Sequence, residues 1–431
     1  MIERYTRPEM GRIWSEEFRF NTWLQVEIAA CVAHNKLGVV PDDALEEIKT
    51  KAKFDIERIK EIEKTCDHET IAFLTNVAEY VGPASRYIHY GMTSSDKLDT
   101  ATALQLVAAS DLLLEDIKTL HKSVGALAKK HKHTIMVGRS HGIHAEPITF
   151  GLKVAIWYTE LGRHLERMER ARDTIRVGKV SGSVGTFSHI DMRVEEIVCD
   201  ELGLEAAGVS NQIVQRDRHA EWLAAIAGVG ATLEKIAVEI RGLQRTEVRE
   251  VQEPFPPGNK GSSSMPHKKN PNLSERITGL ARLLRGYAIT GWENVALWHE
   301  RDISHSCVER VSLTDASILL DYMLERMNWI IENLIVDPDR MKYNLDSTHG
   351  VVFSQKILLA LTRKGMSRED AYKIVQETSL RIWGSDAMLI DELKANADVK
   401  KLLSDDEIDA CFQCDEILTN ADKIFERIGL S

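Results

Sequence analysis

Proline is scarce and unevenly placed in this sequence. The 431 residues contain ten prolines, and five of them fall between Pro254 and Pro271. Between Pro83 and Pro254 the only proline is Pro147, and after Pro271 the only one is Pro338. Because proline breaks helix interiors, the long proline-free stretches permit very long helices. No convincing run of alternating apolar and polar residues indicates strands, so we expect an all-α protein.

Segments that would place the chain in a membrane are also lacking. No apolar run approaches membrane-spanning length, and the opening residues MIERYTRPEM contain no apolar stretch of the kind found in a signal peptide. The six cysteines are scattered, and the one close pair, Cys411 and Cys414, is weak evidence for zinc. We expect a cytoplasmic protein with reduced thiols and no membrane partner.

A basic excess is missing as well. The net charge of −11 argues against a general nucleic-acid binder, which usually carries excess positive charge. A small anionic ligand remains compatible with this charge, because it needs only a local cluster of arginines. We therefore expect no nucleic-acid partner.

Apolar residues recur every three or four positions along the proline-poor stretches. Four such stripes cover residues 106–127, 154–175, 223–243 and 316–334. They predict long helices packed lengthwise in a bundle. We predict three helical domains: an N-terminal domain (1–92), a central long-helix bundle (93–338) and a C-terminal domain (339–431). Helices of this length would leave apolar stripes for further copies of the chain to cover, which indicates a homo-oligomer.

Five clusters of polar residues interrupt the helical pattern, each at a break where backbone groups are free. They are CDHET (66–70), HYGMTSSD (89–96), GRSHGIHAEP (138–147), the loop KGSSSMPHKKNP (260–271) and WHERDISHS (298–306). His141 and His144 could suggest a metal site, but Gly142 between them argues against a rigid pair of ligands. A general acid or base is the better interpretation, since histidine titrates near neutral pH.

The loop from Gly258 to Pro271 combines glycines, serines and lysines. Its hydroxyls and backbone amides could cradle an anion that Lys268 neutralises, although the phosphate-loop pattern is absent. A mobile linker is the plain alternative. The residues MPHK (265–268) favour a functional loop, because flexible linkers seldom carry this mixture. Glu275, one turn into the next helix, could orient a histidine.

The loop GSSSMPHKKNP closely resembles the signature Gly-Ser-Ser-x-Met-Pro-x-Lys-x-Asn-Pro of the fumarase/aspartase superfamily. Its histidine before the lysine narrows the resemblance to the adenylosuccinate lyase family or the carboxymuconate cycloisomerases. The segments ERYTRPEM, GRSHGIHAEP, VSNQIVQRDRHAE and WHERDISHSCVER are similar to the adenylosuccinate lyase family. These motifs span nearly the whole chain in the expected order.

The resemblance implies a homotetramer whose core is the central bundle and whose active sites are each assembled from three subunits. It also implies two β-eliminations in purine synthesis, without a metal or an organic cofactor. Adenylosuccinate would give AMP and fumarate, and the succinyl-carboxamide ribotide SAICAR would give the carboxamide ribotide AICAR and fumarate.

The resemblance also implies roles for individual residues. Ser262 is the expected base, with adjacent Ser263 as its rival, and a serine alkoxide needs nearby donors or a cation and a dry site. His141 is the expected acid, oriented by Glu275. His68 would support the phosphate or the acid, and Lys268 would stabilise the developing carboxylate charge. The expected substrate contacts are Arg4, Tyr5, His89, Thr93, Ser94, Gln212, Asn270, Arg301, Ser306 and Arg310, among which the arginines suit bidentate bonding to phosphate and carboxylate.

The chain departs from the family in one cluster, where Asp67-His68-Glu69 replaces the common Arg-His-Asp, and in a smaller way at Lys269, which stands in place of an arginine. Glu69 keeps the charge on a longer side chain, and we assign Asp67 no role. Three alternatives stay open: a cycloisomerase with the same loop, a non-enzymatic helical scaffold, and a nucleotide-regulated binding protein. A scaffold or a binding protein should have lost the catalytic base and acid. Substrate tests distinguish a cycloisomerase from a lyase.

Overall fold

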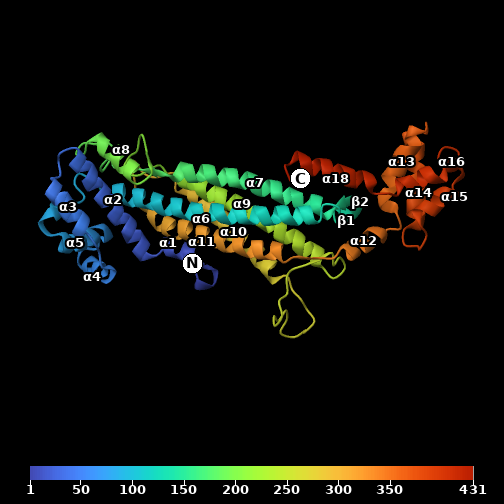
Figure 1. The fold of residues 1–431 in the computed structure, drawn as a ribbon, viewed down its shortest axis with the longest axis horizontal. Helices are drawn as coiled ribbons and strands as arrows, with labels where there is room; N and C mark the ends of the chain where they lie inside the picture. The colour runs from blue at the N-terminus through green and yellow to red at the C-terminus, as the bar shows by residue number, and fades with distance from the viewer. Residues whose placement is uncertain (431) are drawn as a thin grey trace. The chain divides into compact units, whose positions relative to one another are not determined.

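A computed structural model of the protein describes residues 1–430, and it is mostly helical (Figure 1). The five longest helices are α6 (Ser94–Lys130), α7 (Phe150–Ile175), α9 (Asp217–Gln244), α10 (Asn272–Glu293) and α11 (Ser304–Glu332). They occupy the proline-poor stretches, so the predicted long helices are confirmed. Their apolar stripes are buried: Leu113, Leu161 and Leu233, for example, have no exposed surface.

Shorter elements precede and follow the long helices. At the N-terminal end they are η1 (Glu3–Tyr5), α1 (Pro8–Ile13), α2 (Glu16–Lys36), α3 (Asp42–Lys51), α4 (Ile56–Cys66), α5 (Glu69–Val81) and η2 (Gly82–Tyr87). Between α7 and α9 lies α8 (Met192–Glu201). After α11 come α12 (Pro338–Asp346), η3 (Val351–Phe353), α13 (Ser354–Arg363), α14 (Arg368–Ile382), α15 (Leu389–Ala395), α16 (Ala397–Lys400), α17 (Asp405–Cys411) and α18 (Asp415–Arg427).

Three two-stranded sheets accompany the helices, although the sequence indicated no strands. The antiparallel pair β1 (Ile135–Ser140) and β2 (Ile143–Thr149) is the largest of them. The others are the parallel pair β3 (Val177–Gly178) and β4 (Glu205–Ala206) and the antiparallel pair β5 (Val251–Gln252) and β6 (Ile335–Val336). The β1–β2 hairpin coincides with the cluster GRSHGIHAEP, where polar residues and a bulge between Val137 and Arg139 hide the alternating pattern.

The chain divides into two compact units. Unit 1 comprises Met1–Lys118, Arg163–Glu234 and Ile277–Arg326. Its helices α2 to α5 pack around a cluster of buried aromatic rings, in which Phe20 stacks on Phe73 and both meet the edge of Trp23. Aromatic side chains bury large apolar areas, so this cluster stabilises the N-terminal helices.

Unit 2 comprises Thr119–Gly162, Lys235–Arg276 and Met327–Ser431. Its C-terminal helices α13 to α17 enclose a separate core around Ile357, Leu389 and Leu393. The unit also contains the β1–β2 hairpin and the loop before α10. The predicted division into domains 1–92, 93–338 and 339–431 stays a prediction. Among residues 1–430, no helix is both long enough and apolar enough to cross a membrane.

Candidate active site

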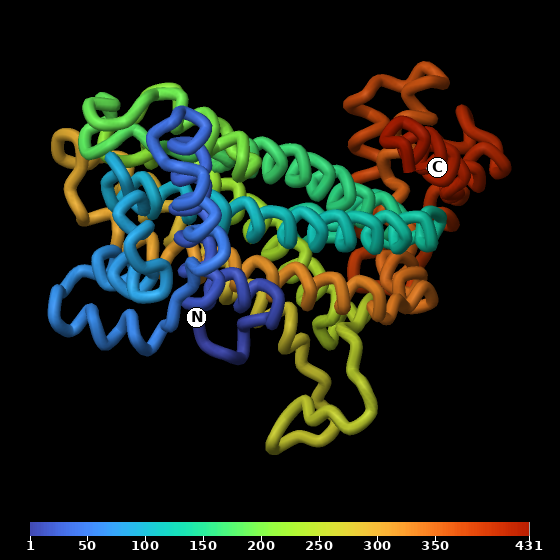
Figure 2. The backbone as a smooth tube through the Cα atoms, turned by 60° about the vertical axis from the view of Figure 1, so that its left-hand side comes forward, coloured from blue at the N-terminus to red at the C-terminus, as the bar shows by residue number. Residues whose placement is uncertain are grey.

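The signature loop is an irregular segment of unit 2 between α9 and α10 (Figure 2). Its two ends are tied together at Gly261, whose carbonyl accepts a hydrogen bond from Nδ2 of Asn270 at 2.7 Å. A Cβ added at Gly261 would lie 1.8 Å from the carbonyl oxygen of Lys268, so only glycine fits there. Gly261 and Asn270 of the motif therefore form the base of the loop.

Two polar side chains outside the motif anchor the loop to the helices. Glu253 caps α10, because its carboxylate accepts hydrogen bonds from the backbone N–H groups of Leu273 and Ser274 at 3.0 and 2.9 Å. Gln244 at the end of α9 accepts a bond from the N–H of Glu253 at 2.8 Å and donates one to the carbonyl of Lys269 at 3.1 Å. Sequence reasoning missed both residues, although Glu253 directly precedes the proline cluster.

Ser262 has a distinctive environment within this loop. Its Oγ accepts hydrogen bonds from the backbone N–H groups of Met265 at 3.1 Å and Ser264 at 3.3 Å. Backbone donors aimed at an oxygen stabilise negative charge on it. Ser263 and Lys268, by contrast, are exposed, and Ser262 is half-buried. Of the two adjacent serines, Ser262 is thus the one whose alkoxide form the backbone would favour.

His141 lies at the tip of the β1–β2 hairpin. His141 and Gly142 form the two-residue turn, and both have positive φ angles, 55° and 78°, as a type I′ turn requires. The strand below is fixed by Arg139, which makes two hydrogen bonds of 2.9 and 2.7 Å to the buried carboxylate of Glu250. The hairpin therefore presents the exposed His141 on a rigid support.

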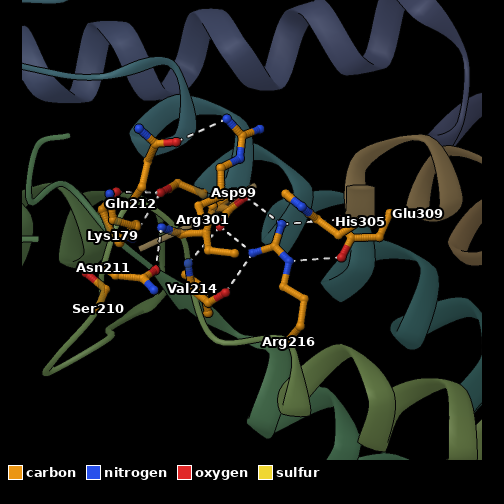
Figure 3. Close-up of polar contacts among 12 residues, drawn as sticks. Asp99, Lys179, Ser210, Asn211, Gln212, Val214, Arg216, Arg301, His305 and Glu309 are labelled. Atoms are coloured by element: carbon orange, nitrogen blue, oxygen red, sulfur yellow. Dashed lines mark hydrogen bonds and ion pairs between the residues drawn. The ribbon is translucent and has the colours of Figure 1, made fainter. Parts of the chain in front are cut away.

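A cavity of about 310 Å³ lies in unit 1. Three of the expected substrate residues line it: Arg301, Ser306 and Arg310. A fourth, Gln212, accepts a hydrogen bond from Nη1 of Arg301 at 3.1 Å (Figure 3). The Nε of Arg301 is buried and has no hydrogen-bond partner within residues 1–430, so an oxygen of a ligand would satisfy it.

A buried ion network supports one wall of this cavity (Figure 3). Arg216 donates to Asp99 at 2.6 and 3.0 Å and to Glu309 at 2.9 and 3.1 Å. The neighbouring His305 is buried, and burial together with the Arg216 charge lowers its pKa to about 4, so it is neutral at pH 7. With Arg216 balanced by two carboxylates, the remaining arginines of the wall, Arg19 among them, favour an anionic ligand.

Glu69 connects two of these arginines. Its carboxylate binds Nη2 of Arg19 at 2.6 Å and Nη2 of Arg310 at 3.1 Å. Burial opposes ionisation of Glu69, but the two guanidinium groups hold its pKa below the ordinary value. Glu69 thus orients two cavity-lining arginines, Arg19 and Arg310. His68 caps α5 by accepting the N–H of Ile71 on Nδ1 at 3.4 Å, and Asp67 is exposed.

Thr93 and Ser94 lie at the start of α6, next to the cavity-lining Ser95. The N–H of Thr93 donates to Asp96 at 2.8 Å, and fully buried Asp96 is paired with fully buried Lys179. His89 is held by Glu27, whose Oε1 lies 2.8 Å from Nδ1 of the histidine. These buried acids and Lys179 were missed from the sequence, because their partners lie far along the chain.

The structure brings the expected residues together in two groups. In unit 1, Arg301, Ser306 and Arg310 share the cavity, Gln212 is bonded to Arg301, and His68 adjoins Glu69. In unit 2, Ser262, Lys268 and Asn270 lie on the loop. No hydrogen bond described for residues 1–430 joins His141 to Glu275, so the orientation of His141 by Glu275 remains a prediction.

Known proteins resemble this chain over its full length. Residues 3–286 match the family model described as lyase, and residues 350–428 match the model described as adenylosuccinate lyase C-terminus. The adenylosuccinate lyase of a Synechocystis species is 55% identical over 431 residues, covering all of both chains. The chain belongs to the adenylosuccinate lyase family. The predicted resemblance is confirmed, and the protein is a carbon–nitrogen lyase.

Three further comparisons place the chain within the superfamily. The adenylosuccinate lyase of Bacillus subtilis is 50% identical over the whole length of both chains. Among solved structures, a fumarate lyase from Mesorhizobium sp. BNC1 superposes with a TM-score of 0.88 at 26% identity, covering 98% of this chain and 99% of that one. A 3-carboxy-cis,cis-muconate lactonizing enzyme from Pseudomonas putida gives 0.87 at 29% identity, with 98% of each chain covered. This chain thus shares the fold of these two solved structures, but its sequence is much closer to those of the adenylosuccinate lyases.

Proposed function

We propose that this protein releases fumarate from adenylosuccinate, giving AMP, and from SAICAR, giving AICAR, as a step of purine biosynthesis in the cytoplasm. The full-length identity to proteins named adenylosuccinate lyase carries the proposal. The arginine-rich cavity of unit 1 supports it, because both substrates bear a phosphate and two carboxylates. A cycloisomerase is less favoured, since the muconate enzyme shares the fold at only 29% identity.

The proposed reaction is a β-elimination. Ser262, as the alkoxide, removes a proton from the carbon beside a carboxylate and becomes the hydroxyl. The resulting dianion expels the nitrogen, the C–N bond breaks, and His141 protonates the leaving nitrogen. The backbone donors at Oγ of Ser262 favour this serine over Ser263 as the base. Lys268 on the same loop would stabilise the developing carboxylate charge.

The exposed loop gives the mechanism a conformational step. A serine is a poor base in water and becomes effective when the site is closed and dry. We propose that the loop closes over the bound substrate, pivoting at the anchors Gln244, Glu253 and Gly261. Glu275 would orient His141, and His68 would assist on the phosphate or acid side.

The proposed substrate contacts divide by chemistry. Arg4, Tyr5, Arg301, Ser306 and Arg310 would hold the phosphate and the carboxylates. The other contacts would come from His89, Thr93, Ser94, Gln212 and Asn270.

We also propose a homotetramer with active sites shared between subunits. Exposed apolar side chains on α10 support this assembly. Leu283, Ile289 and Trp292 are 47, 54 and 58% exposed. Large apolar side chains exposed on one helix are what a second copy would cover.

The experiment that tests the function is fumarate release by the purified protein, with adenylosuccinate and SAICAR supplied separately. Each assay is run with and without a chelator, and carboxymuconate serves as the control substrate. Fumarate from both nucleotides, unaffected by the chelator, is the expected result. Turnover of carboxymuconate alone would instead place the chain with the cycloisomerases.

A further inference from the structure

The segment that contains Arg4 and Tyr5 is docked through Arg7. Nη1 of Arg7 lies 2.9 Å from Oδ2 of Asp116 on α6 and 2.9 Å from Oδ1 of Asp321 on α11. One guanidinium nitrogen thus bridges two carboxylates that are 205 positions apart (321 − 116) in the chain. All three residues belong to unit 1. The segment is also held by its aromatic residue, because the ring of Tyr5 packs at 5.1 Å from that of Tyr322 on α11.

The two carboxyl groups share one guanidinium nitrogen, and Asp321 is the more deeply buried of them. The side chain of Asp321 is 2% exposed, and its Oδ2 is buried without a hydrogen-bond partner within residues 1–430. A buried carboxyl oxygen that lacks a donor favours the protonated form of the acid. Burial, with the neighbouring Asp116, raises the pKa of Asp321 to about 8. Glu9 and Glu325 also face the pair, so Arg7 offsets an excess of acid there.

Arg4 directly precedes the attachment points Tyr5 and Arg7 and is exposed. Residues Glu3–Tyr5 form a single turn of 3-10 helix, and Arg4 is exposed while Tyr5 and Arg7 are half-buried. The hydroxyl of Thr6 also donates to the carbonyl of Ile2 at 3.0 Å and closes the turn from the other side. A short segment fixed in this manner loses little further freedom when its exposed arginine binds a ligand.

We propose that Arg7, held by Asp116 and Asp321, is a positioning residue that pre-orders Arg4 and Tyr5 to bind the phosphate of the substrate. The inference rests on the proposed function, which supplies the role of Arg4 and Tyr5. Arg7 itself does not touch the substrate. It acts through the segment, and the arrangement converts a flexible N-terminal arginine into a fixed phosphate ligand.

The test uses the full-length enzyme with the substitution Arg7→Gln and two substrates, adenylosuccinate and its dephosphorylated nucleoside, succinyladenosine. The expected result is a KM for adenylosuccinate raised about 10- to 100-fold, with kinetics on succinyladenosine unchanged. The variant Arg12→Gln makes the same substitution at an exposed arginine of α1 and should behave as the wild type. The double variant Asp116→Asn/Asp321→Asn removes the carboxylates and should reproduce the effect of Arg7→Gln.

A double-mutant cycle separates positioning from general support of the fold. Arg4→Gln should show the same substrate-specific loss, and adding Arg7→Gln to it should cause little further change, because the two residues act as a unit. Equal losses on both substrates, additive effects in the cycle, or an unchanged KM in Arg7→Gln would each overturn the inference. Absence of fumarate release by the wild-type enzyme would instead overturn the proposed function.

Discussion

At the residue scale, backbone conformation marks two of the proposed site positions and the neighbour of a third. His89, His141 and Asp67, which precedes His68, have φ angles of 63°, 55° and 50°. Residues other than glycine seldom adopt this left-handed conformation, and it persists where the surroundings impose it. For His141 the cause is the tight hairpin turn, and for Asp67 it is the end of α4, directly before His68. Left-handed backbone conformations therefore occur at His89 and His141 and directly before His68.

Ser262 can be distinguished from Ser263 by substitution. We predict that Ser262→Ala lowers kcat by about 100- to 10,000-fold, the usual contribution of a general base, with little change in substrate binding. Fumarate release measures the first quantity and equilibrium binding the second. Ser263→Ala is the matched control, and a larger loss in that variant would make Ser263 the base.

Lys97 predicts a specific dependence of stability on pH. Its side chain is fully buried, packs at 3.8 Å from the ring of Trp23, and has no hydrogen-bond partner for Nζ within residues 1–430. Burial lowers its pKa to about 7 from 10.5, while nearby Glu27 and Glu69 oppose the shift. Between these values the unfolded chain binds more protons at this lysine than the folded protein does. The contribution of Lys97 to stability therefore rises with pH across this window.

The measurement compares the free energy of unfolding of the wild type with that of Lys97→Met from pH 7 to pH 10. The difference should move in favour of the wild type by up to about 1.4 kcal/mol per pH unit. Lys64→Met, at an exposed lysine of α4, controls for the loss of a lysine. A pH-independent difference for Lys97→Met would contradict the prediction.

At the element scale, the loop depends on contacts at its ends more than on contacts along its length. Gly261 and Asn270 join the two ends of the loop at its base, while Gln244 and Glu253 fix that base to α9 and α10. The residues between, from Ser263 to Lys269, are exposed. This arrangement lets the middle of the loop move while its attachment stays constant.

We predict that Gly261→Ala impairs catalysis without unfolding the protein. The added methyl group would collide with the carbonyl of Lys268 and displace the loop base, which should lower kcat/KM by about 100-fold. Because the loop makes few buried contacts, the free energy of unfolding should change by less than about 1 kcal/mol. Asn259→Ala, at an exposed position of the same loop, is the control, and full activity in Gly261→Ala would exclude this role of the loop base.

At the scale of the whole molecule, the chain leaves apolar surface exposed on a helix that is otherwise well packed. On α10, Leu283, Ile289 and Trp292 are exposed, whereas Ile277 and Leu284 of the same helix are fully buried. Exposure of both a tryptophan and an isoleucine on one helix is costly in water. This surface is the strongest physical support for the proposed tetramer.

We predict that Trp292→Glu weakens assembly and, with it, activity. A charge placed in an apolar contact between copies would be desolvated without a partner, so the sedimentation coefficient should fall towards that of smaller species and fumarate release should decrease in parallel. Gln413→Glu adds the same charge at an exposed position in unit 2 and should leave assembly intact. A fully assembled Trp292→Glu enzyme would exclude Trp292 from the interface.

Much of the architecture followed from local patterns in the sequence. Proline spacing and apolar periodicity are properties of neighbouring residues, so they correctly predicted long helices in 93–338. Motif order was enough to identify the family. The β1–β2 hairpin was missed, because its polar turn and bulge obscure the two-residue period. The catalytic roles assigned by resemblance stay predictions.

Only the tertiary structure decided which charges face one another. Arg7 with Asp116 and Asp321, and Arg216 with Asp99 and Glu309, pair groups separated by about a hundred residues or more. No local pattern records such pairs, since each depends on how distant helices align. Local sequence patterns set the helices, the loop and the kinds of side chain present. The fold decided which side chains are buried, which carboxyl groups lie beside the same guanidinium group, and which arginines remain to bind an anion, because burial and proximity exist only after the helices have packed.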